Sequence, residues 1–247
     1  IRHADNTNEI MVNIVTAFEN TEKLKSLVYE IVENVKNVKS IVNNITKRKA
    51  GVSKGEYEIN LYGKNFIQER INGLTFNISA NSFFQTNTKQ TENLYSMILD
   101  ESNLTGNEVV YDLYCGTGTI GISMAKYVKR VYGFEINKSA VNDAIINAQI
   151  NNIKNIKFFK GDLQNIFRVN LDTRKIQKPD IIIIDPPRAG MHKKTILDII
   201  KKKPEKIIYI SCNPSTQARD VKELSDNNYN LNKIVPIDMF PHTPHIE

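Results

Sequence analysis

The first 80 residues combine alternating and amphipathic patterns of apolar side chains. Strand-length apolar runs flank a segment whose apolar side chains recur at the three- and four-residue spacing of a helix. The predicted strands cover residues 8–18, 38–46, 56–62, 65–71 and 74–79, and the helix covers residues 21–35. Glycines separate the last three strands, as is typical of tight turns. The pattern predicts a small α+β module over residues 1–80.

Beyond residue 80, strands alternate with helices. The predicted strands are 109–114, 130–135, 156–161, 180–185, 206–211 and 228–238. The predicted helices are 88–101, 119–128, 138–151, 193–203 and 214–225, with a further short helix after residue 161. Several strands, DIIIID among them, contain continuous apolar runs, which is typical of parallel strands covered on both faces. We therefore predict an α/β fold with a doubly wound, mostly parallel sheet over residues 81–247.

Composition narrows the class of protein. With 40% hydrophobic and 24% charged residues, the chain is globular rather than disordered. No apolar run approaches the roughly 18 residues of a membrane-spanning helix, and no signal-peptide layout is visible. A net charge of +6 favours a polyanionic partner only weakly. Two cysteines are too few for a disulfide framework, and no ligand spacing indicates a metal, so we expect a reduced, cytoplasmic, monomeric protein without metal.

A glycine-rich turn follows the strand at residues 109–114. The sequence DLYCGTGTIG contains Gly116, Gly118 and Gly121 as G-x-G-x-x-G between a strand and a helix, which is the context that the motif requires. Glu135 ends the next strand, where a carboxylate can accept hydrogen bonds from both hydroxyls of a ribose. The spacing predicts a site for a nucleoside cofactor.

Acidic residues around this turn favour S-adenosylmethionine over a dinucleotide. Asp112 lies just before the glycines, where a carboxylate would repel a pyrophosphate but could pair with an amino group and a sulfonium. Asp162 follows the third strand, where it could bind an adenine amino group, although an aspartate there also fits a helix N-cap. NAD is the alternative cofactor.

Two other strand ends carry unusual residues. Ligands of open α/β sheets bind beyond the carboxyl ends of the strands. One strand ends at Asp185 and continues as DPPRAG, whose prolines fix the backbone. Another continues as SCNPSTQARD, which places Cys212 before a helix N-terminus and near Arg219, and both favour a thiolate. We predict that Cys212 is a nucleophile and that Cys115 is a buried packing residue.

A methyl donor, a thiolate and a carboxylate suit methylation at carbon 5 of a pyrimidine. This carbon is too weak a nucleophile to be methylated unaided. Addition of a thiolate to carbon 6 activates it, and a base must then remove the carbon 5 proton.

Together, these motifs resemble those of the RNA uracil-5-methyltransferases, which make 5-methyluridine in tRNA and in large-subunit ribosomal RNA. The resemblance rests on FFQTN, DLYCGTGTIG, DPPRAG, SCNPSTQARD and DMFPHTPHIE, in the order found in the family. It covers essentially the whole chain, because residues 1–80 are similar to the family's central α+β module. It implies a Rossmann-like methyltransferase sheet, S-adenosylmethionine as cofactor and RNA as substrate.

The resemblance also implies roles for individual residues. Cys212 would attack carbon 6 of the uracil, and Glu247 would remove the carbon 5 proton. The positions that match cofactor contacts of the family are Gln85, Tyr114, Glu135 and Asp185, to which the local arguments above add Gly116 and Asp162. Family chains continue past this glutamate with a last strand, so we expect the sheet to lack that strand.

Several alternatives stay open. The DPPRAG and QTN sequences and the central module favour 23S ribosomal RNA as the target, with tRNA as the alternative. An amino-group methyltransferase also has two prolines after a strand-end polar residue, but it needs no cysteine and usually has an aromatic residue where Arg188 stands. A non-catalytic RNA-binding factor is a candidate of another class.

Overall fold

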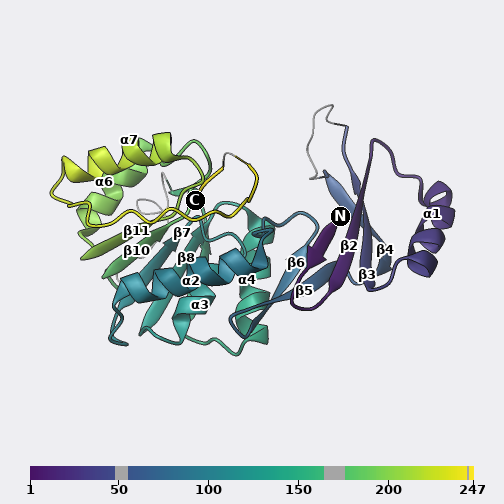
Figure 1. The fold of residues 1–247 in the computed structure, drawn as a ribbon, viewed down its shortest axis with the longest axis horizontal. Helices are drawn as coiled ribbons and strands as arrows, with labels where there is room; N and C mark the ends of the chain where they lie inside the picture. The colour runs from purple at the N-terminus through teal and green to yellow at the C-terminus, as the bar shows by residue number, and fades with distance from the viewer. Residues whose placement is uncertain (48–54, 164–175, 244) are drawn as a thin grey trace. The chain divides into compact units, whose positions relative to one another are not determined.

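The chain forms two compact units, Ile1–Phe84 and Gln85–Glu247 (Figure 1). This computed structural model describes residues 1–47, 55–163, 176–243 and 245–247. The short helix predicted after residue 161 lies almost entirely outside the described residues. No helix within the described ranges is both long and apolar enough to cross a membrane.

The first unit is a mixed β-sheet with one helix and a separate hairpin. Its elements are β1 (Arg2–Ala4), β2 (Glu9–Thr16), α1 (Thr21–Asn34), β3 (Val38–Ile45), β4 (Tyr57–Gly63), β5 (Phe66–Ile71) and β6 (Leu74–Ser79). The sheet order is β1-β2-β3-β4, in which only β2 and β3 run parallel, and β5 pairs with β6. The buried carboxylate of Glu69 on β5 accepts hydrogen bonds from the backbone N–H groups of Asp5 and Asn6, which holds the hairpin beside the turn after β1.

The second unit is a five-stranded parallel sheet with helices between its strands. Its elements are α2 (Thr88–Ser102), β7 (Val109–Leu113), α3 (Thr119–Ala125), β8 (Arg130–Glu135), α4 (Lys138–Ile150), β9 (Ile156–Lys160), β10 (Ile181–Ile184), α6 (Lys193–Lys202), β11 (Lys206–Tyr209) and α7 (Pro214–Ser225). The strand order is β11-β10-β7-β8-β9, with every pairing parallel. The α/β prediction is confirmed.

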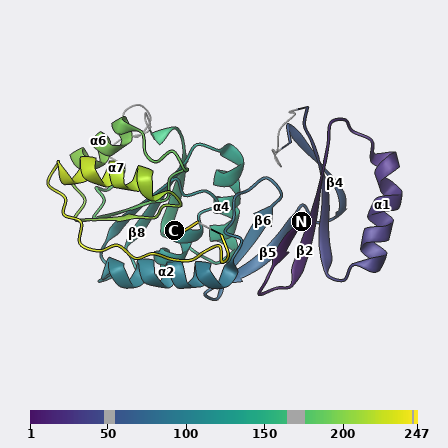
Figure 2. The ribbon, with the colours of Figure 1, turned by 45° about the horizontal axis from the view of Figure 1, so that its top comes forward.

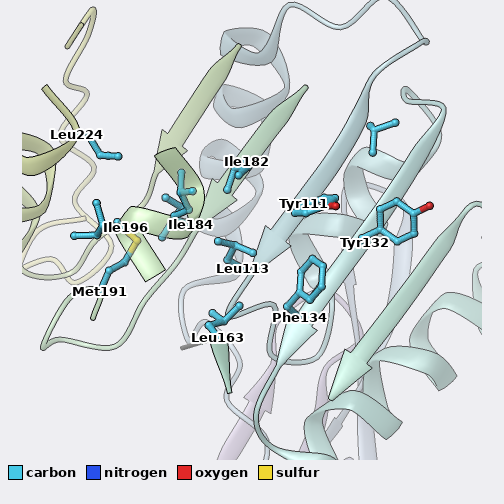
Figure 3. Close-up of a cluster of buried hydrophobic side chains, with 12 residues drawn as sticks. Tyr111, Leu113, Tyr132, Phe134, Leu163, Ile182, Ile184, Met191, Ile196 and Leu224 are labelled. Atoms are coloured by element: carbon cyan, nitrogen blue, oxygen red, sulfur yellow. The ribbon is translucent and has the colours of Figure 1, made fainter. Parts of the chain in front are cut away.

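Helices cover both faces of this sheet, with α6 and α7 on one side and α2 on the other (Figures 1 and 2). The core beneath α6 and α7 is lined by alternate residues of the central strands (Figure 3), among them Tyr111 and Leu113 of β7 and Phe134 of β8. The alternation sends the intervening residues, including Asp112, to the opposite face. Because β7 and β10 are buried on both faces, neither alternates between polar and apolar residues: β10 is entirely isoleucine, and β7 has Asp112 as its one charged residue.

The strand predicted at residues 228–238 is wrong. This segment is irregular and runs back along α2 (Figures 1 and 2), with Lys233 paired to Glu101 at one end of that helix. Several of its apolar side chains, such as Ile234 at 73% exposure, stay in solvent, whereas Ile237 is buried. A strand requires a neighbouring backbone to complete its hydrogen-bond ladder, and among the described residues this segment has such a partner only at Ile237, which pairs with Glu247.

Candidate active site

The predicted site residues gather at the carboxyl edge of the five-stranded sheet. Since all five strands are parallel, the segments that follow β7, β8, β10 and β11 leave from one edge. Backbone hydrogen bonds hold the first residues of these segments together. The N–H of Cys115 donates to the carbonyl of Phe134 at 3.1 Å, and that of Ile210 donates to the carbonyl of Ile184 at 2.8 Å. Segments that are distant in the sequence are thus fixed side by side.

The glycine turn after β7 lies against Glu135. The carboxylate of Glu135 accepts hydrogen bonds from the N–H groups of Gly116 at 3.1 Å and Asn137 at 2.7 Å. Gly116 has a φ of 52°, and a side chain there would meet no atom within 4 Å. An open space therefore lies beside this backbone and the carboxylate that we predict to bind a ribose.

Asp112 lies beneath the same turn and is fully buried. Its Oδ2 accepts a hydrogen bond of 2.9 Å from the N–H of Gly121, whereas its buried Oδ1 has no hydrogen-bond partner. Burial raises the pKa of Asp112 to about 7, and the charge of Glu135 adds to the rise, although the Gly121 hydrogen bond opposes it. Burying a carboxylate is costly unless its charge is compensated.

Asp185 interacts through its charge with both Asp112 and Glu247, and we call these three groups the carboxyl cluster. Ile183 of β10 is in register with Asp112 of β7, so Asp185, two residues further along β10, leaves the sheet on the Asp112 side. Burial and the charges of Glu247 and Asp112 raise the pKa of Asp185 to about 7. Burial also raises the pKa of Glu247, whose Oε2 is buried without a hydrogen-bond partner.

The last residues of the chain are held at this edge by several contacts. Glu247 exchanges two backbone hydrogen bonds with Ile237, of 2.8 and 3.0 Å. Asn87, which caps α2, donates its Nδ2 to the carbonyl of Met239 at 3.2 Å. The segment also contacts the loop after β10, because a guanidinium nitrogen of Arg188 lies 3.1 Å from Nδ1 of His245. These contacts bring Glu247 to the sheet edge that carries Asp185.

Cys212 lies between β11 and α7 and is half-buried. The next residue, Asn213, caps α7 with its side chain and also donates its Nδ2 to the carbonyl of Arg188 at 3.0 Å. Thr216, in the first turn of α7, donates to the same carbonyl at 3.1 Å. The start of α7 is thus tied to the DPPRAG loop. Cys115 is buried in the glycine turn, where burial raises the pKa of its thiol, in line with a packing role.

Arg219 has a different role from the predicted one. Its guanidinium pairs with Asp220 at 2.7 Å and donates to the carbonyls of Ala189 and Met191. Asp220, which is 1% exposed, accepts hydrogen bonds from the Met191 N–H at 2.7 Å and from a tyrosine hydroxyl on β11. Asp220 thus balances the charge of Arg219, and no hydrogen bond or ion pair among the described residues joins Arg219 to Cys212.

We call the four residues that join α7 to the loop after β10 the loop clamp. They are Asn213, Thr216, Arg219 and Asp220. Sequence analysis included them in a motif but assigned no positioning role to them. The glycine at position 190 is the sequence feature that could have indicated the clamp. Gly190 has a φ of 74°, and a Cβ there would lie 2.6 Å from an oxygen of Asp220.

The remaining predicted residues lie around these groups. Gln85 precedes α2, and its buried Oε1 has no hydrogen-bond partner. Tyr114 has a φ of 61° and packs against the core beneath α6. Burial raises the pKa of Tyr114, the interaction with Thr195 opposes the rise, and the charges of Asp220 and Asp162 add to it. Within the described parts of the chain, no three His, Cys, Asp or Glu side chains are grouped as metal ligands.

Comparison with known proteins gives a family. The model of the tRNA (uracil-5-)-methyltransferase family matches residues 8–247. The chain is 42% identical to an uncharacterized RNA methyltransferase of Chlorobaculum tepidum and 42% identical to one of Staphylococcus aureus, over all of this chain but only 51% and 54% of those proteins. The chain therefore spans about half of the length of these relatives.

A solved structure agrees in both fold and sequence. The tRNA (uracil-54, C5)-methyltransferase of Pyrococcus abyssi, in complex with S-adenosyl-L-homocysteine, matches with a TM-score of 0.80 and 36% identity. The match covers 99% of this chain and 56% of that one. The family match over most of the chain and this agreement in fold lead to one conclusion: the chain belongs to the tRNA (uracil-5-)-methyltransferase family.

Proposed function

We propose that this chain carries the catalytic machinery of an RNA methyltransferase that acts on carbon 5 of uridine. The observation that carries the proposal is the meeting of Cys212 and Glu247 at one sheet edge. Cys212 comes directly before Asn213, through which the loop clamp ties the start of α7 to the loop after β10. Asp185 begins that loop, and the charge of Glu247 acts on Asp185. A nucleophile and a base that can both reach one substrate ring are what the reaction requires.

The chain's own residues then divide the chemistry. Cys212 forms a bond to carbon 6 of the uracil, which makes carbon 5 nucleophilic. After carbon 5 is methylated, Glu247 takes the carbon 5 proton, and the bond between Cys212 and carbon 6 breaks. Burial of Glu247 favours this role, since the raised pKa makes its carboxylate a stronger base. The target uridine must leave its stack to reach both groups.

S-adenosylmethionine would supply an electrophilic methyl group on a cationic sulfur. The chemistry of the residues present fits this cofactor. Buried oxygens of Gln85, Asp112 and Glu247 have no hydrogen-bond partner, and the space beside Gly116 is open next to Glu135. We propose Gln85, Tyr114, Gly116, Glu135, Asp162 and Asp185 as the cofactor-binding residues. The S-adenosyl-L-homocysteine bound in the Pyrococcus abyssi relative supports the choice of cofactor.

A substrate in which carbon 5 carries fluorine tests the reaction. Fluorine cannot be removed as a proton, so a covalent protein–RNA adduct should accumulate on a denaturing gel when the whole protein is mixed with S-adenosylmethionine and 5-fluorouridine RNA. Cys212→Ala should abolish the adduct, whereas Cys115→Ala, the matched control, should retain it. No adduct from a folded, cofactor-binding protein on either class of RNA would contradict the proposal and favour an amino-group methyltransferase.

We propose 23S ribosomal RNA as the target, and tRNA is the competing substrate. The DPPRAG and QTN sequences support ribosomal RNA, whereas the solved relative from Pyrococcus abyssi acts on tRNA. Transfer of labelled methyl groups to unmodified ribosomal RNA and to tRNA transcripts separates the two. Methylation of tRNA alone would refute the ribosomal assignment.

A further inference from the structure

Asn87 joins the start of α2 to the segment that carries Glu247. Its Oδ1 accepts a hydrogen bond of 3.2 Å from the N–H of Gln90, as expected of an N-cap, and its Nδ2 donates to the carbonyl of Met239 at 3.2 Å. Asn87 is itself held in place, because its own carbonyl accepts hydrogen bonds from the N–H of Thr91 at 2.9 Å and from the hydroxyl of Thr91 at 2.7 Å. The amide of Asn87 is therefore a fixed donor at the start of the helix.

Met239 belongs to a closed loop that ends at Glu247. The backbones of Ile237 and Glu247 exchange hydrogen bonds of 2.8 and 3.0 Å, which closes the chain between them. The N–H of Met239 also donates to the carbonyl of Ile237 at 3.1 Å, and the side chains of both residues are buried. A displacement of Met239 would thus be passed on to Glu247 through Ile237. We call residues 237–243 and 245–247, the described part of this loop, the base loop.

The hydrogen bond from Asn87 holds the base loop on the side of α2. It is partly buried, whereas the contact between Arg188 and His245 on the other side joins two exposed side chains. Water competes more strongly for exposed hydrogen-bonding groups. Just before Met239, a groove of about 450 Å³ opens between α2 and residues 235–238, so this stretch is not packed continuously against the helix. The Asn87 hydrogen bond is therefore the anchor of the base loop on α2.

We propose that Asn87 positions the general base, because it holds the base loop so that the carboxyl group of Glu247 reaches carbon 5 of the uracil. The inference rests on the proposed function, and it goes beyond that function by assigning to Asn87 a role in one step. In that step the carboxylate takes the carbon 5 proton. The electron pair of the carbon–hydrogen bond forms the double bond between carbons 5 and 6, and the carbon–sulfur bond breaks with its electron pair on Cys212.

Three substitutions separate the two hydrogen bonds of the Asn87 side chain. Asn87→Ser retains an oxygen that caps α2, but it has no amide to reach Met239. Asn87→Asp also caps the helix, and its carboxylate would face the carbonyl of Met239, which repels it. Asn87→Ala loses both hydrogen bonds. If Asn87 acts only as a cap, Asn87→Ala alone should differ from the wild type, whereas a positioning role requires that Asn87→Ser and Asn87→Asp are impaired as well.

Single-turnover kinetics measure the step itself. Samples of the whole protein with S-adenosylmethionine and the ordinary uridine RNA that the wild type methylates are quenched and run on a denaturing gel, which follows the covalent adduct as it forms and breaks down. Asn87→Ser should form the adduct at the wild-type rate but break it down about tenfold more slowly, and Asn87→Asp should be slower still. The KM for RNA should stay unchanged.

Asn20→Ser is the matched control for the loss of an asparagine cap. Asn20 is the N-cap of α1, and its side chain accepts a hydrogen bond of 3.1 Å from the third residue of that helix, as Asn87 does in α2. Asn20→Ser should leave both the formation and the breakdown of the adduct unchanged.

Hydrogen–deuterium exchange tests the anchoring without RNA or cofactor. The amides of Ile237 and Glu247 both donate hydrogen bonds within the base loop. They should exchange about fivefold to tenfold faster in Asn87→Ser, because the loop has lost one of its anchors. Amides in the middle of α2 should exchange at the wild-type rate, since the serine retains the cap.

The outcomes separate this inference from the proposed function. Breakdown at the wild-type rate in both Asn87→Ser and Asn87→Asp would overturn the positioning role, as would unchanged exchange of the base loop in both variants. In either case, formation of the fluorouridine adduct would leave the proposed function standing. Slow breakdown together with faster exchange supports the role. A folded, cofactor-binding wild type that forms no fluorouridine adduct would refute the proposed function, and the positioning role with it.

Discussion

Gly190→Ala places a methyl group inside the loop clamp. Gly190 lies in the loop between β10 and α6 with a φ of 74°. A Cβ added at this position would lie 2.6 Å from Oδ2 of Asp220 and 2.7 Å from a guanidinium nitrogen of Arg219. Neither side chain can easily retreat, because Asp220 is held by the Met191 N–H and by the ion pair with Arg219.

The expected cost has two parts. Holding alanine in the left-handed region costs about 1 kcal/mol. Displacing a hydrogen bond of the buried Asp220 carboxylate costs about 2 kcal/mol more, since hydrogen bonds to charged groups contribute roughly 1.5–3 kcal/mol. The free energy of unfolding of this unit should therefore fall by about 3 kcal/mol. Gly106 is a matched control in the same unit, because it has a φ of 95° and an added Cβ would meet no atom within 4 Å, so Gly106→Ala should cost about 1 kcal/mol.

Urea unfolding monitored by circular dichroism measures both variants. A third variant, Asp220→Ala, removes the oxygen that the new methyl group would meet. The double variant Gly190→Ala/Asp220→Ala should therefore lose less stability than the sum of the two single losses. Equal losses for Gly190→Ala and Gly106→Ala, or strict additivity in the double variant, would refute the view that Gly190 is required by the clamp.

Other predictions concern the cofactor turn, the core and the base. Asp112→Asn should make the stability of the ligand-free protein less sensitive to pH. The folded-state pKa of Asp112 is raised from 3.8 to about 7, so its contribution to stability is lost as pH rises through 7. The free energy of unfolding in urea should therefore fall less between pH 5 and pH 8 in the variant. Asn147→Ala, which removes a buried hydrogen bond to the carbonyl of Thr117, should weaken cofactor binding about fivefold by calorimetry, and unchanged affinity would exclude this role. Phe134→Ala should lower the free energy of unfolding by about 3–5 kcal/mol, whereas Ile136→Ala, at an exposed position, should change it by less than about 0.5 kcal/mol. Glu247→Gln should trap a covalent adduct on ordinary uridine RNA, and a free, methylated product would show that another group is the base.

Local patterns were sufficient to predict the fold of the second unit. Continuous apolar strands such as IIII in β10, alternating with capped helices, indicate a parallel sheet because only burial on both faces permits such sequences. The wrong strand prediction at residues 228–238 arose because strand formation also depends on distant parts of the chain. Apolar residues such as Ile234 give the same strand pattern whether or not a neighbouring backbone is available, and hydrogen-bond pairing is not a local property.

The candidate site shows the same division between local and non-local information. The place of Cys212 before a helix N-terminus could be predicted, because the strand and the helix on either side of it are visible within a short stretch of sequence. The loop clamp could not, because Asp220 and Gly190 are 30 residues apart and only the pairing of β10 with β11 brings them together. Arg219 shows how a local argument fails, since it is close to Cys212 in sequence but its partners in space are Asp220 and two carbonyls of the adjoining loop. The carboxyl cluster follows the same logic. Each carboxylate can be explained separately as a cofactor contact or a base. Their interaction emerges only because the register of β7 and β10 places Asp185 on the side of Asp112, and because the hydrogen bonds with Ile237 bring Glu247 to the same edge.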